Sequence, residues 1–219
     1  MPSHEATRRK AFSREFGKRA LDVAISALAI VVLSPILMAV WMAIRLDSPG
    51  PAIFRQRRIG RGEKPFNCLK FRTLYHQADE NVHREAIRRL WANEPLSNDP
   101  DALYKLTDDS RVTRVGRWLR RTSLDELPQF LNILRGEMST VGPRPAIPYE
   151  LEYFRDWHHK RHIVKPGITG ICQVRGRGRL RPEVMLEMDV DYAMNWTLWT
   201  DLKLIALTFP AVLRGRGAR

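Results

Sequence analysis

Two acidic residues stand side by side in the stretch RRTSLDELPQFLNILRGEMSTVGPRP, residues 120–145. Asp125 and Glu126 come just before apolar residues at helical spacing, so we expect them at or near a helix N-terminus. One explanation is structural: Ser123 followed three residues later by Glu126 fits a capping box, and acidic side chains suit the positive end of a helix dipole. Spacing alone favours this capping role, but it also permits chemistry.

Such a pair could also take part in chemistry on an anionic, phosphorylated ligand. Free N–H groups at a helix N-terminus attract anions, and a divalent cation held by carboxylates would bring a diphosphate to the same place. Asp125 follows Arg120 and Arg121, whose charges favour the ionised carboxylate that a nucleophile requires. Pro128 is tolerated only near a first helical turn, so it places the acidic pair within a residue or two of the helix start.

A basic amphipathic segment, RVTRVGRWLRR, leads into the acidic pair. Val112, Val115 and Leu119 follow one apolar helical face, and arginines occupy the remaining faces. These arginines form either a solvated surface or a phosphate site, because guanidinium groups match phosphate oxygens bidentately. They are Arg111, Arg114, Arg117, Arg120 and Arg121.

Three histidines lie close together near residue 160, and two cysteines stand far apart. His158, His159 and His162 resemble a metal site by composition, but no carboxylate or further histidine completes a familiar ligand spacing. We therefore expect these histidines at a surface or interface. Cys68 and Cys172 form no CxxC motif, which favours free thiols in a reducing compartment.

The chain that must position these residues has 219 residues, enough for one domain of ordinary size with an appendage. It carries 37 Lys and Arg against 24 Asp and Glu, a net charge of +13. Such an excess predicts an anionic partner: nucleic acid, a phosphorylated substrate or membrane headgroups. The stretches VRGRGRLR (174–181) and LRGRGAR (213–219) resemble nucleic-acid-binding arms, but beside a membrane helix we expect them to meet anionic headgroups.

The longest apolar run is VAISALAIVVLSPILMAVWMAI, residues 23–44, whose 22 residues carry no charge. A helix of this length crosses a hydrocarbon core of about 30 Å, and a soluble core helix is rarely so apolar on every side. A signal peptide is the alternative, but its apolar region is usually about 7–15 residues long, and no small-residue cleavage site is evident. The run therefore predicts membrane insertion.

Both flanks of this run are basic, with six Lys or Arg in residues 1–19 and eight in residues 45–72. Lys and Arg mark the cytoplasmic side, so both flanks indicate the cytoplasm. Ser34 and Pro35 lie in the middle, where proline kinks a helix and the serine can bond a carbonyl that the proline frees. A re-entrant helix explains these features, although sequence physics alone leaves a kinked spanning helix open.

The remaining sequence predicts a mixture of helices and short strands. AIF and FNCLKFRTL read as strands around a basic turn, and residues 76–92 read as a charged, solvated helix. NEPLSNDPD (93–101) reads as a loop. These elements together predict a mostly helical domain with a minor sheet.

Taken together, these motifs resemble the bacterial sugar transferases, the monotopic phosphoglycosyl transferases that begin glycan assembly on a polyprenyl phosphate. The matching stretches occur in the same order and cover nearly the whole chain after residue 17, which is far more specific than a lone Asp-Glu pair. They are KRALDVAISALAIVVLSPILMA, FRQRRIG, LKFRT, DDSRVTRVGRWLRRTSLDELPQFLNILRGEMSTVGPRP, KPGITGICQVRGR and DYAMNWTLWTDLKL.

The resemblance implies an α+β fold, mostly helical, in a monotopic membrane protein with a re-entrant N-terminal helix and a compact cytosolic catalytic domain. The expected parts are a basic N-terminal segment (1–19), a re-entrant membrane helix (20–46) and a cytosolic catalytic domain with interfacial helices (47–219). We expect the minimal form of the family, without a large N-terminal extension. The implied location is the bacterial inner membrane, with the catalytic domain on the cytoplasmic face.

The activity that the resemblance implies is transfer of a sugar-1-phosphate from a UDP-sugar to undecaprenyl phosphate, with release of UMP, to begin an exopolysaccharide or related surface glycan. The implied cofactor is Mg²⁺, and the implied partners are the two substrates and the membrane. A homo-oligomer is compatible with the sequence, and nucleic acid is not expected. The alternative is a non-catalytic, membrane-tethered protein that binds nucleic acid or acidic lipid, which leaves the Asp-Glu pair unexplained.

Two residues carry the reaction in this family. Asp125 matches the nucleophile that attacks the β-phosphate of the UDP-sugar, and Glu126 matches the Mg²⁺-binding partner. Ser34 and Pro35 match the kink of the family's re-entrant helix, which favours the hairpin over the spanning form.

Four further residues match substrate-binding positions. Lys70, Arg120 and Asp189 fall at the family's other polar active-site positions. Arg144, between two prolines, matches a motif associated with nucleotide binding.

Each of these substrate-binding assignments has a structural alternative. Lys70, together with Arg72, could be an exposed charge on a strand edge, and Arg144 could merely rigidify a turn. Asp189 could be a helix cap or half of a surface ion pair.

The sequence departs from the family pattern at two positions. Ser110 replaces a common proline, and Cys172 replaces a frequent aromatic residue. We expect both to affect local packing and neither to touch the chemistry.

Overall fold

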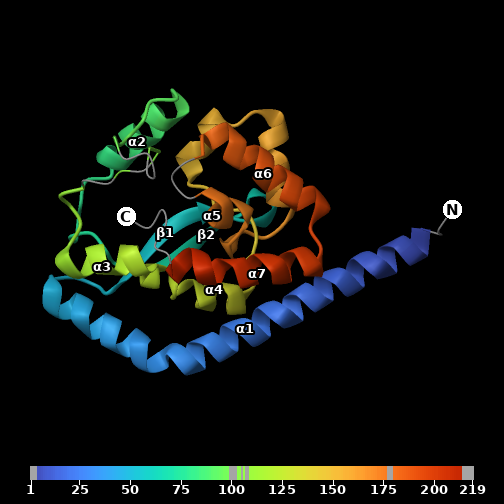
Figure 1. Cartoon of the computed structure of the whole chain (residues 1–219), viewed down its shortest axis with the longest axis horizontal. Coiled ribbons are helices and arrows are strands. Elements are labelled where there is room, and N and C mark those ends of the chain that lie inside the picture. Colours follow the sequence, from blue (N-terminus) through green and yellow to red (C-terminus); the bar gives the residue numbers. More distant parts are fainter. Residues whose placement is uncertain (1–3, 99–102, 105, 107–108, 177–179, 214–219) are drawn as a thin grey trace.

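Helices dominate the fold, and two small sheets hold them together (Figure 1). The structure is a computed structural model that describes residues 4–98, 103–104, 106, 109–176 and 180–213. The helices are α1 (His4–Asp47), α2 (Asn81–Trp91), α3 (Arg114–Thr122), α4 (Gln129–Arg135), α5 (Ile171–Gly176), α6 (Pro182–Asn195) and α7 (Leu198–Leu213). The strands are β1 (Ile53–Ile59), β2 (Pro65–Phe71), β3 (Ser139–Val141) and β4 (Gly167–Thr169). Short 3₁₀ helices are η1 (Arg61–Glu63), η2 (Leu124–Glu126), η3 (Pro148–Tyr153) and η4 (Asp156–Ile163).

The predicted strand pair around a basic turn is confirmed. β1 and β2 form an antiparallel hairpin in which Ile53 faces Phe71 and Ile59 faces Pro65. A separate parallel pair, β3 and β4, joins the segment after α4 to the segment after η4. The hairpin contacts η2 through β2 and contacts η4 through η1 at its tip, so it runs between these two parts of the molecule.

The predicted helices over residues 76–92 and 111–121 are also confirmed, as α2 and α3. Thr113 caps α3 by accepting a hydrogen bond from the Gly116 amide at 2.9 Å. The predicted loop is described at residues 93–98 only, and most of the two basic arms, residues 177–179 and 214–219, also falls outside the described residues.

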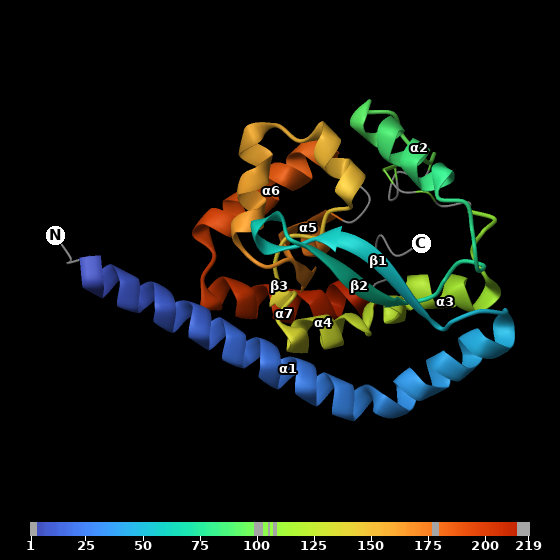
Figure 2. The ribbon, with the colours of Figure 1, turned by 180° about the vertical axis from the view of Figure 1, so that it is seen from behind.

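The apolar run lies in α1, which is one helix of 44 residues, about 66 Å long at 1.5 Å per residue. Figures 1 and 2 show this helix bent into two arms rather than straight. Pro35 lies inside it and has no N–H for the carbonyl of Val31, four residues earlier. The Ser34 hydroxyl donates to that carbonyl at 2.8 Å, so the predicted replacement bond is confirmed.

The first arm of α1 docks on the rest of the fold through charged side chains near residue 20. Lys18 donates to the Val141 carbonyl and to the Asp201 carboxylate. Arg19 donates to the last carbonyls of α4, and buried Asp22 accepts from the Thr140 amide. Arg14, whose guanidinium lies over the Trp196 ring, adds a third internal contact from the basic residues of the N-terminal flank.

The second arm docks through apolar side chains. Val40 and Ile44 are buried in one core cluster with Phe71 of β2 and Leu119 of α3. Arg72, which the sequence left as a possible exposed charge, is buried and donates to the carbonyl of Ser48, just after α1 ends. Both arms of α1 are thus fixed to the same domain.

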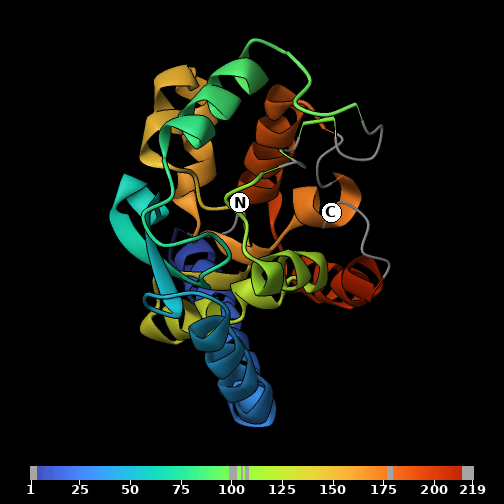
Figure 3. The same ribbon diagram turned by 90° about the vertical axis from the view of Figure 1, so that its left-hand side faces the viewer.

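On both sides of its kink, α1 exposes large apolar side chains, and α3, α4 and α7 also expose them. In Figures 1 and 3 these helices lie on the side of the molecule opposite α2. An exposed apolar surface of this size marks an interaction site, and it suits a lipid bilayer. Its members include Leu28, Val31, Val32, Met38, Met42, Trp118, Leu131, Trp199, Leu207 and Phe209.

Within the part of the chain that the structure describes, one helix is long and apolar enough to cross a membrane, by length and composition. The most apolar 18-residue window of this segment, Ser13–Asp47, has a mean hydropathy of 2.6, and 11% of that window is buried. A core helix of a soluble protein would be mostly buried, so the exposure favours contact with lipid.

Candidate active site

The acidic pair lies in η2, a 3₁₀ turn between α3 and α4. Ser123 ends α3 in the left-handed conformation, with φ +57°, and this turns the chain toward η2. The expected capping box is not formed, because a capping Ser needs an extended backbone. Helix α4 itself begins at Gln129 after Pro128, so Asp125 and Glu126 precede the helix that the sequence predicted they would begin.

Lys70 from the end of β2 reaches this turn. Its Nζ lies 3.3 Å from Oε1 of Glu126, and about a quarter of each side chain is exposed. An ion pair with this exposure contributes roughly 0–1 kcal/mol, so its value lies in positioning two charges rather than in stability. Lys70 is therefore a partner of the carboxylate pair and not an isolated charge on a strand edge.

Arg120 approaches the pair from α3. Its Nε donates to Oγ1 of Thr73 at 3.0 Å. Burial lowers the pKa of Arg120, and the nearby charges of Asp109 and Asp125 oppose that effect. Because the charge of Asp125 acts on Arg120, the predicted proximity of these two residues is confirmed.

One glycine allows α3 to come this close to the end of the hairpin. A Cβ at Gly116 would lie 2.1 Å from the carbonyl oxygen of Thr73. The Thr113 amide donates to the same carbonyl at 3.0 Å. A side chain at Gly116 would therefore push α3, and with it Arg120, away from β2.

The sequence predicted that the arginines of residues 111–121 form either a solvated surface or a phosphate site, and the structure places them in different environments. Arg114, Arg117 and Arg121 are exposed, as expected of a solvated face. Arg111 is paired with Asp109 at 2.7 Å. Only Arg120 among these five enters the site around the acidic pair in the described structure.

Arg144 lies on a second, separately anchored segment. Its backbone carbonyl accepts a hydrogen bond from Arg161 at 2.6 Å, and the next carbonyl, of Pro145, accepts from Arg58 at 2.7 Å. Arg58 and Arg161 are buried, and burial beside Arg144 lowers the pKa of Arg58 to about 10. Two buried guanidinium groups thus hold the Pro-Arg-Pro turn while the Arg144 side chain is exposed.

Asp189 lies inside α6 and is buried, so it is neither a helix cap nor half of a surface ion pair. It accepts from Arg161 at 2.6 Å, and the Cys172 thiol lies 3.3 Å from its other oxygen. Burial raises the pKa of Asp189, opposed by the charge of Arg161. Cys172 was expected to affect local packing without touching the chemistry, and its thiol lies against Asp189, one of the predicted site residues.

The predicted residues therefore form two groups, both near the β1–β2 hairpin. Asp125 and Glu126 lie with Lys70 and Arg120, whereas Arg144 and Asp189 are joined through Arg161. The charges of Lys70, Glu126, Arg58 and Arg144 all act on the thiol of Cys68 in β2, so both groups lie close to this part of the strand.

Sequence reasoning missed Arg58 and Arg161 as supports of this site. Arg58 falls within the motif FRQRRIG, whose arginines gave a signal of importance but no role. Arg161 lies in the run HHKRH, where nothing in the sequence marks it, and its partner Asp189 is 28 residues away.

The carboxylate pair fits a hard divalent cation by its donor chemistry. Mg²⁺ prefers carboxylate oxygens and keeps several waters, which requires a site open to solvent. Asp125 and Glu126 are both partly exposed, and cationic Lys70 and Arg120 border them where phosphate oxygens would lie.

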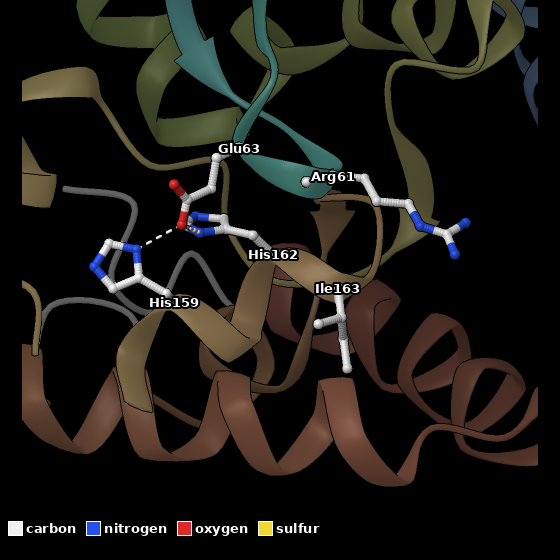
Figure 4. Close-up of a pocket in the computed structure, with 6 residues that line it drawn as sticks. Arg61, Glu63, His159, His162 and Ile163 are labelled. Carbon is white, nitrogen blue, oxygen red and sulfur yellow. Dashed lines mark hydrogen bonds and ion pairs between the residues drawn. The ribbon is translucent and has the colours of Figure 1, made fainter. Parts of the chain in front are cut away.

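The expectation for the histidines was wrong in two respects. His158 and His162 are buried rather than at the surface. A carboxylate does complete the group: Glu63 from the hairpin tip lies against His159 and His162, with one ligand atom of each within 4.8 Å of the others (Figure 4). Burial, with the charge of Arg161, lowers the pKa of His162 to about 4.

The family model for bacterial sugar transferases matches residues 13–215. The chain belongs to the bacterial sugar transferase family. The matched region of this sugar transferase includes both arms of α1 from Ser13 onward, η2 and the segment around Arg144, so the resemblance seen in the sequence is confirmed at the level of the family.

Among curated relatives, the chain is 40% identical over 207 residues to the undecaprenyl-phosphate galactose phosphotransferase of Salmonella typhimurium, covering 94% of this chain and 42% of that protein. It is 42% identical over 204 residues to a UDP-glucose:undecaprenyl-phosphate glucose-1-phosphate transferase of Caulobacter vibrioides, covering 90% and 69%. It is 39% identical over 202 residues to the exopolysaccharide production protein ExoY of Sinorhizobium fredii, covering 92% and 87%. This sugar transferase thus spans less than half of the Salmonella protein but most of ExoY.

Proposed function

We propose that this sugar transferase moves a sugar-1-phosphate from a UDP-sugar to undecaprenyl phosphate, releasing UMP, as the first step of an exopolysaccharide or other surface glycan. The observation that carries the proposal is the Asp125–Glu126 pair beside Lys70 and Arg120, on a domain whose neighbouring helices expose an apolar face. The names of the relatives supply the two substrates.

The reaction proceeds in two displacements at phosphorus. A carboxylate oxygen of Asp125 forms a bond to the β-phosphorus of the UDP-sugar, and the bond to the leaving phosphate oxygen breaks, which releases UMP. A phosphate oxygen of undecaprenyl phosphate then attacks the same phosphorus, and the Asp125–phosphorus bond breaks. The products are the diphosphate-linked sugar and a regenerated carboxylate.

Neighbouring charges support both displacements. Lys70 and Arg120 would face phosphate oxygens, and Arg144 would contribute to nucleotide binding from the neighbouring Pro-Arg-Pro turn. Asp189 acts through Arg161 as a positioning residue for the Arg144 turn. Glu126 would hold Mg²⁺, which when bound supplies positive charge against the phosphates.

Membrane placement follows from the lipid substrate. We place the protein at the bacterial inner membrane, with the catalytic domain on the cytoplasmic face and α1 re-entrant. Support comes from the two arms of α1: Lys18 and Asp22 on one and Val40 and Ile44 on the other contact the same domain. A straight spanning helix would carry one end away from that domain.

Purified full-length protein in detergent, supplied with undecaprenyl phosphate, Mg²⁺ and a panel of UDP-sugars, tests the activity by UMP release. We expect release with at least one donor, and a lipid-linked sugar diphosphate as the second product. Release with no donor would favour the rival function, a membrane-tethered protein that binds acidic lipid or nucleic acid without catalysis.

A further inference from the structure

A second group of possible ligands lies away from the carboxylate pair, where the hairpin tip meets η4. Glu63 comes from η1, at the opposite end of β2 from Lys70, and His159 and His162 come from η4. The seven residues of β2 extend about 23 Å, so this group is distant from η2. We propose that Glu63, His159 and His162 form a binding site for one divalent transition-metal ion of the zinc class.

The local backbone brings the two histidines onto one face. In a 3₁₀ helix each turn takes three residues, so side chains three apart lie directly above one another. His159 and His162 have this spacing within η4, which runs from Asp156 to Ile163. An α-helix would rotate the second histidine away by a part of a turn.

The hairpin tip directs the carboxylate toward them. Glu63 has φ +61°, a left-handed conformation that non-glycine residues rarely adopt. Its carboxylate points at the two imidazoles, whereas the Arg61 side chain points away from them (Figure 4) and pairs with Glu15. Arg61 therefore does not occupy the space between the three side chains.

His162 is the strongest reason to expect a ligand. It is 6% exposed, and neither ring nitrogen has a hydrogen-bond partner among the described residues. Its Nδ1 lies 3.5 Å from Oε1 of Glu63, but the two atoms do not align as a hydrogen bond. Two tetrahedral zinc ligands at about 2.0–2.1 Å from the ion lie about 3.3 Å apart, which matches this separation.

His159 completes the site after a small movement. Its Nδ1 is 2.5 Å from the same Glu63 oxygen, a hydrogen-bond distance shorter than the spacing of two ligands on one ion. Ion entry requires these atoms to separate by about 1 Å. The His159 side chain is 37% exposed, so it can rotate outward without disturbing the core.

The donor set selects the class of metal. Two imidazole nitrogens and one carboxylate oxygen suit Zn²⁺, Co²⁺ or Ni²⁺, whereas Mg²⁺ and Ca²⁺ prefer oxygen donors alone. Three protein ligands leave a fourth tetrahedral position for water or an outside ligand. The three side chains line a surface pocket with Arg61, Gly62 and Ile163, so this position is reached from solvent.

A bound ion would join the hairpin to η4 at this point. The residue before His162 is Arg161, which holds the Arg144 carbonyl and the Asp189 carboxylate. Fastening η4 to the hairpin would therefore also steady the Pro-Arg-Pro turn, which Arg58 of the same hairpin holds from the other side.

The test is metal binding by the full-length protein in detergent, stripped with EDTA and then kept in excess Mg²⁺ to occupy oxygen sites. Calorimetric titration with Zn²⁺ should show one ion per chain, and Co²⁺ should give the visible absorption of four-coordinate histidine ligation. Glu63→Gln and His159→Ala should each weaken Zn²⁺ binding by at least about tenfold. At a hundredfold excess over the wild-type Kd, Zn²⁺ should raise the Tm of the wild type by roughly 5–10 °C and that of Glu63→Gln by no more than about half as much.

Two matched variants distinguish this site from others. Glu126→Gln alters the other carboxylate group, and His76→Ala removes an exposed histidine elsewhere; both should bind Zn²⁺ as the wild type does. Equal binding by the wild type, Glu63→Gln and His159→Ala would overturn the proposal, as would no binding by the wild type. Loss of the ion in Glu126→Gln alone would assign it to the carboxylate pair instead. All readouts are independent of sugar transfer, so failure of the proposed function would leave them interpretable.

Discussion

At the scale of single residues, the site joins two kinds of charge that differ in burial. Asp125, Glu126 and Lys70 are partly exposed, whereas Arg58, Arg161 and Asp189 are almost completely buried. Exposed charges can exchange water for substrate phosphates, and buried charges must keep their protein partners because desolvation is costly. This difference separates the residues that we expect to touch substrate from those that hold them in place.

Replacing Asp125 with Asn should abolish turnover with the fold intact. The amide keeps the shape of the side chain but cannot act as an anionic nucleophile, so we expect UMP release to fall by roughly a thousandfold or more. Intact-protein mass spectrometry should detect a phosphosugar adduct on the wild type and none on the variant. Asp191→Asn, at an exposed position of α6, is the control. An active Asp125→Asn protein, with deamidation excluded by mass, would remove Asp125 from its proposed role.

Replacing Glu126 with Gln should change the metal dependence as well as the rate. A neutral amide is a poorer ligand for a hard cation, so the Mg²⁺ concentration for half-maximal activity should rise by about tenfold. The measurement is a Mg²⁺ titration of UMP release for both proteins. Wild-type activity that is indifferent to EDTA would show the assignment of Mg²⁺ to be wrong.

At the scale of elements, contacts between distant segments determine where the charged residues lie. Helix α3 approaches β2 closely because Gly116 has no side chain, and η2 follows from the left-handed turn at Ser123. In the second group, Arg58 of β1 and Arg161 of η4 donate hydrogen bonds to backbone carbonyls of the turn around Arg144. The position of each group of site residues therefore depends on packing between elements that are distant in sequence.

The docking of α1 on α7 predicts a large effect at Lys18. Its Nζ lies 2.5 Å from the buried carboxylate of Asp201, which also accepts from the Tyr192 hydroxyl at 2.6 Å. Lys18→Met leaves this carboxylate without its cation, so the free energy of unfolding should fall. The fall should be about 3 kcal/mol, at the low end for a broken buried ion pair, because Tyr192 still donates to the carboxylate. Thermal unfolding should show Tm lower by roughly 6–12 °C.

Two further variants test that reasoning. Lys203→Met, which removes an exposed lysine of α7, should leave Tm nearly unchanged. In Lys18→Met, the added change Asp201→Asn should restore part of the stability, because it removes the unpaired charge. A double variant as unstable as the sum of the two single variants would contradict an ion pair.

The contact of α2 with η3 predicts a dependence of stability on pH. His83 is hydrogen-bonded to Tyr149, and burial, together with the charges of Arg144 and Arg58, lowers the pKa of His83 to about 4. Between pH 6.5 and 4 the unfolded chain binds a proton that the folded chain does not, so stability falls as pH falls through this window, by at most about 1.4 kcal/mol per pH unit.

The variant that checks this dependence is His83→Gln, which does not titrate. Its Tm should decline less steeply from pH 7 to pH 4.5 than the wild-type Tm, because the two proteins differ only at this histidine. Parallel Tm profiles for the two proteins would show that His83 does not contribute.

At the scale of the whole molecule, the arms of α1 and the apolar surface of α3, α4 and α7 define one side that suits lipid. The re-entrant topology predicts that residues 1–19 and 47–219 share the cytoplasmic side. Replacing Ser34 and Pro35 with Ala should straighten α1 toward a spanning form, because the kink and its replacement hydrogen bond are both removed.

Cysteine labelling from outside intact cells tests the topology. A reporter cysteine at Ser3, with Cys68 and Cys172 first replaced by Ala, should be protected in the native protein and labelled in the Ser34→Ala, Pro35→Ala variant. Labelling of the same proteins after cell lysis gives the maximum accessible signal for comparison. Labelling of the native-kink protein from outside would overturn the re-entrant proposal.

The elements that the sequence predicted well are those whose signals are local. The hairpin, α2 and α3 follow from strand composition and helical spacing within short windows, and Ser34 bonds a carbonyl only three residues away. The family was also accessible, because ordered motifs keep their identity along the chain. The capping box at Ser123 failed even though it is local, because the close of α3 required a left-handed residue there.

The chain by itself determined the apolar length of α1, its proline kink, the excess of positive charge and the chemical types present at each motif. Tertiary structure alone decided which charges are buried and which partners they have. Arg58 reaches a carbonyl 87 residues away, and Glu63 reaches His159 across 96 residues. The reason is physical: the free energy of a charge depends on its solvent exposure and on neighbours within a few ångströms, and folding brings those neighbours from distant parts of the chain.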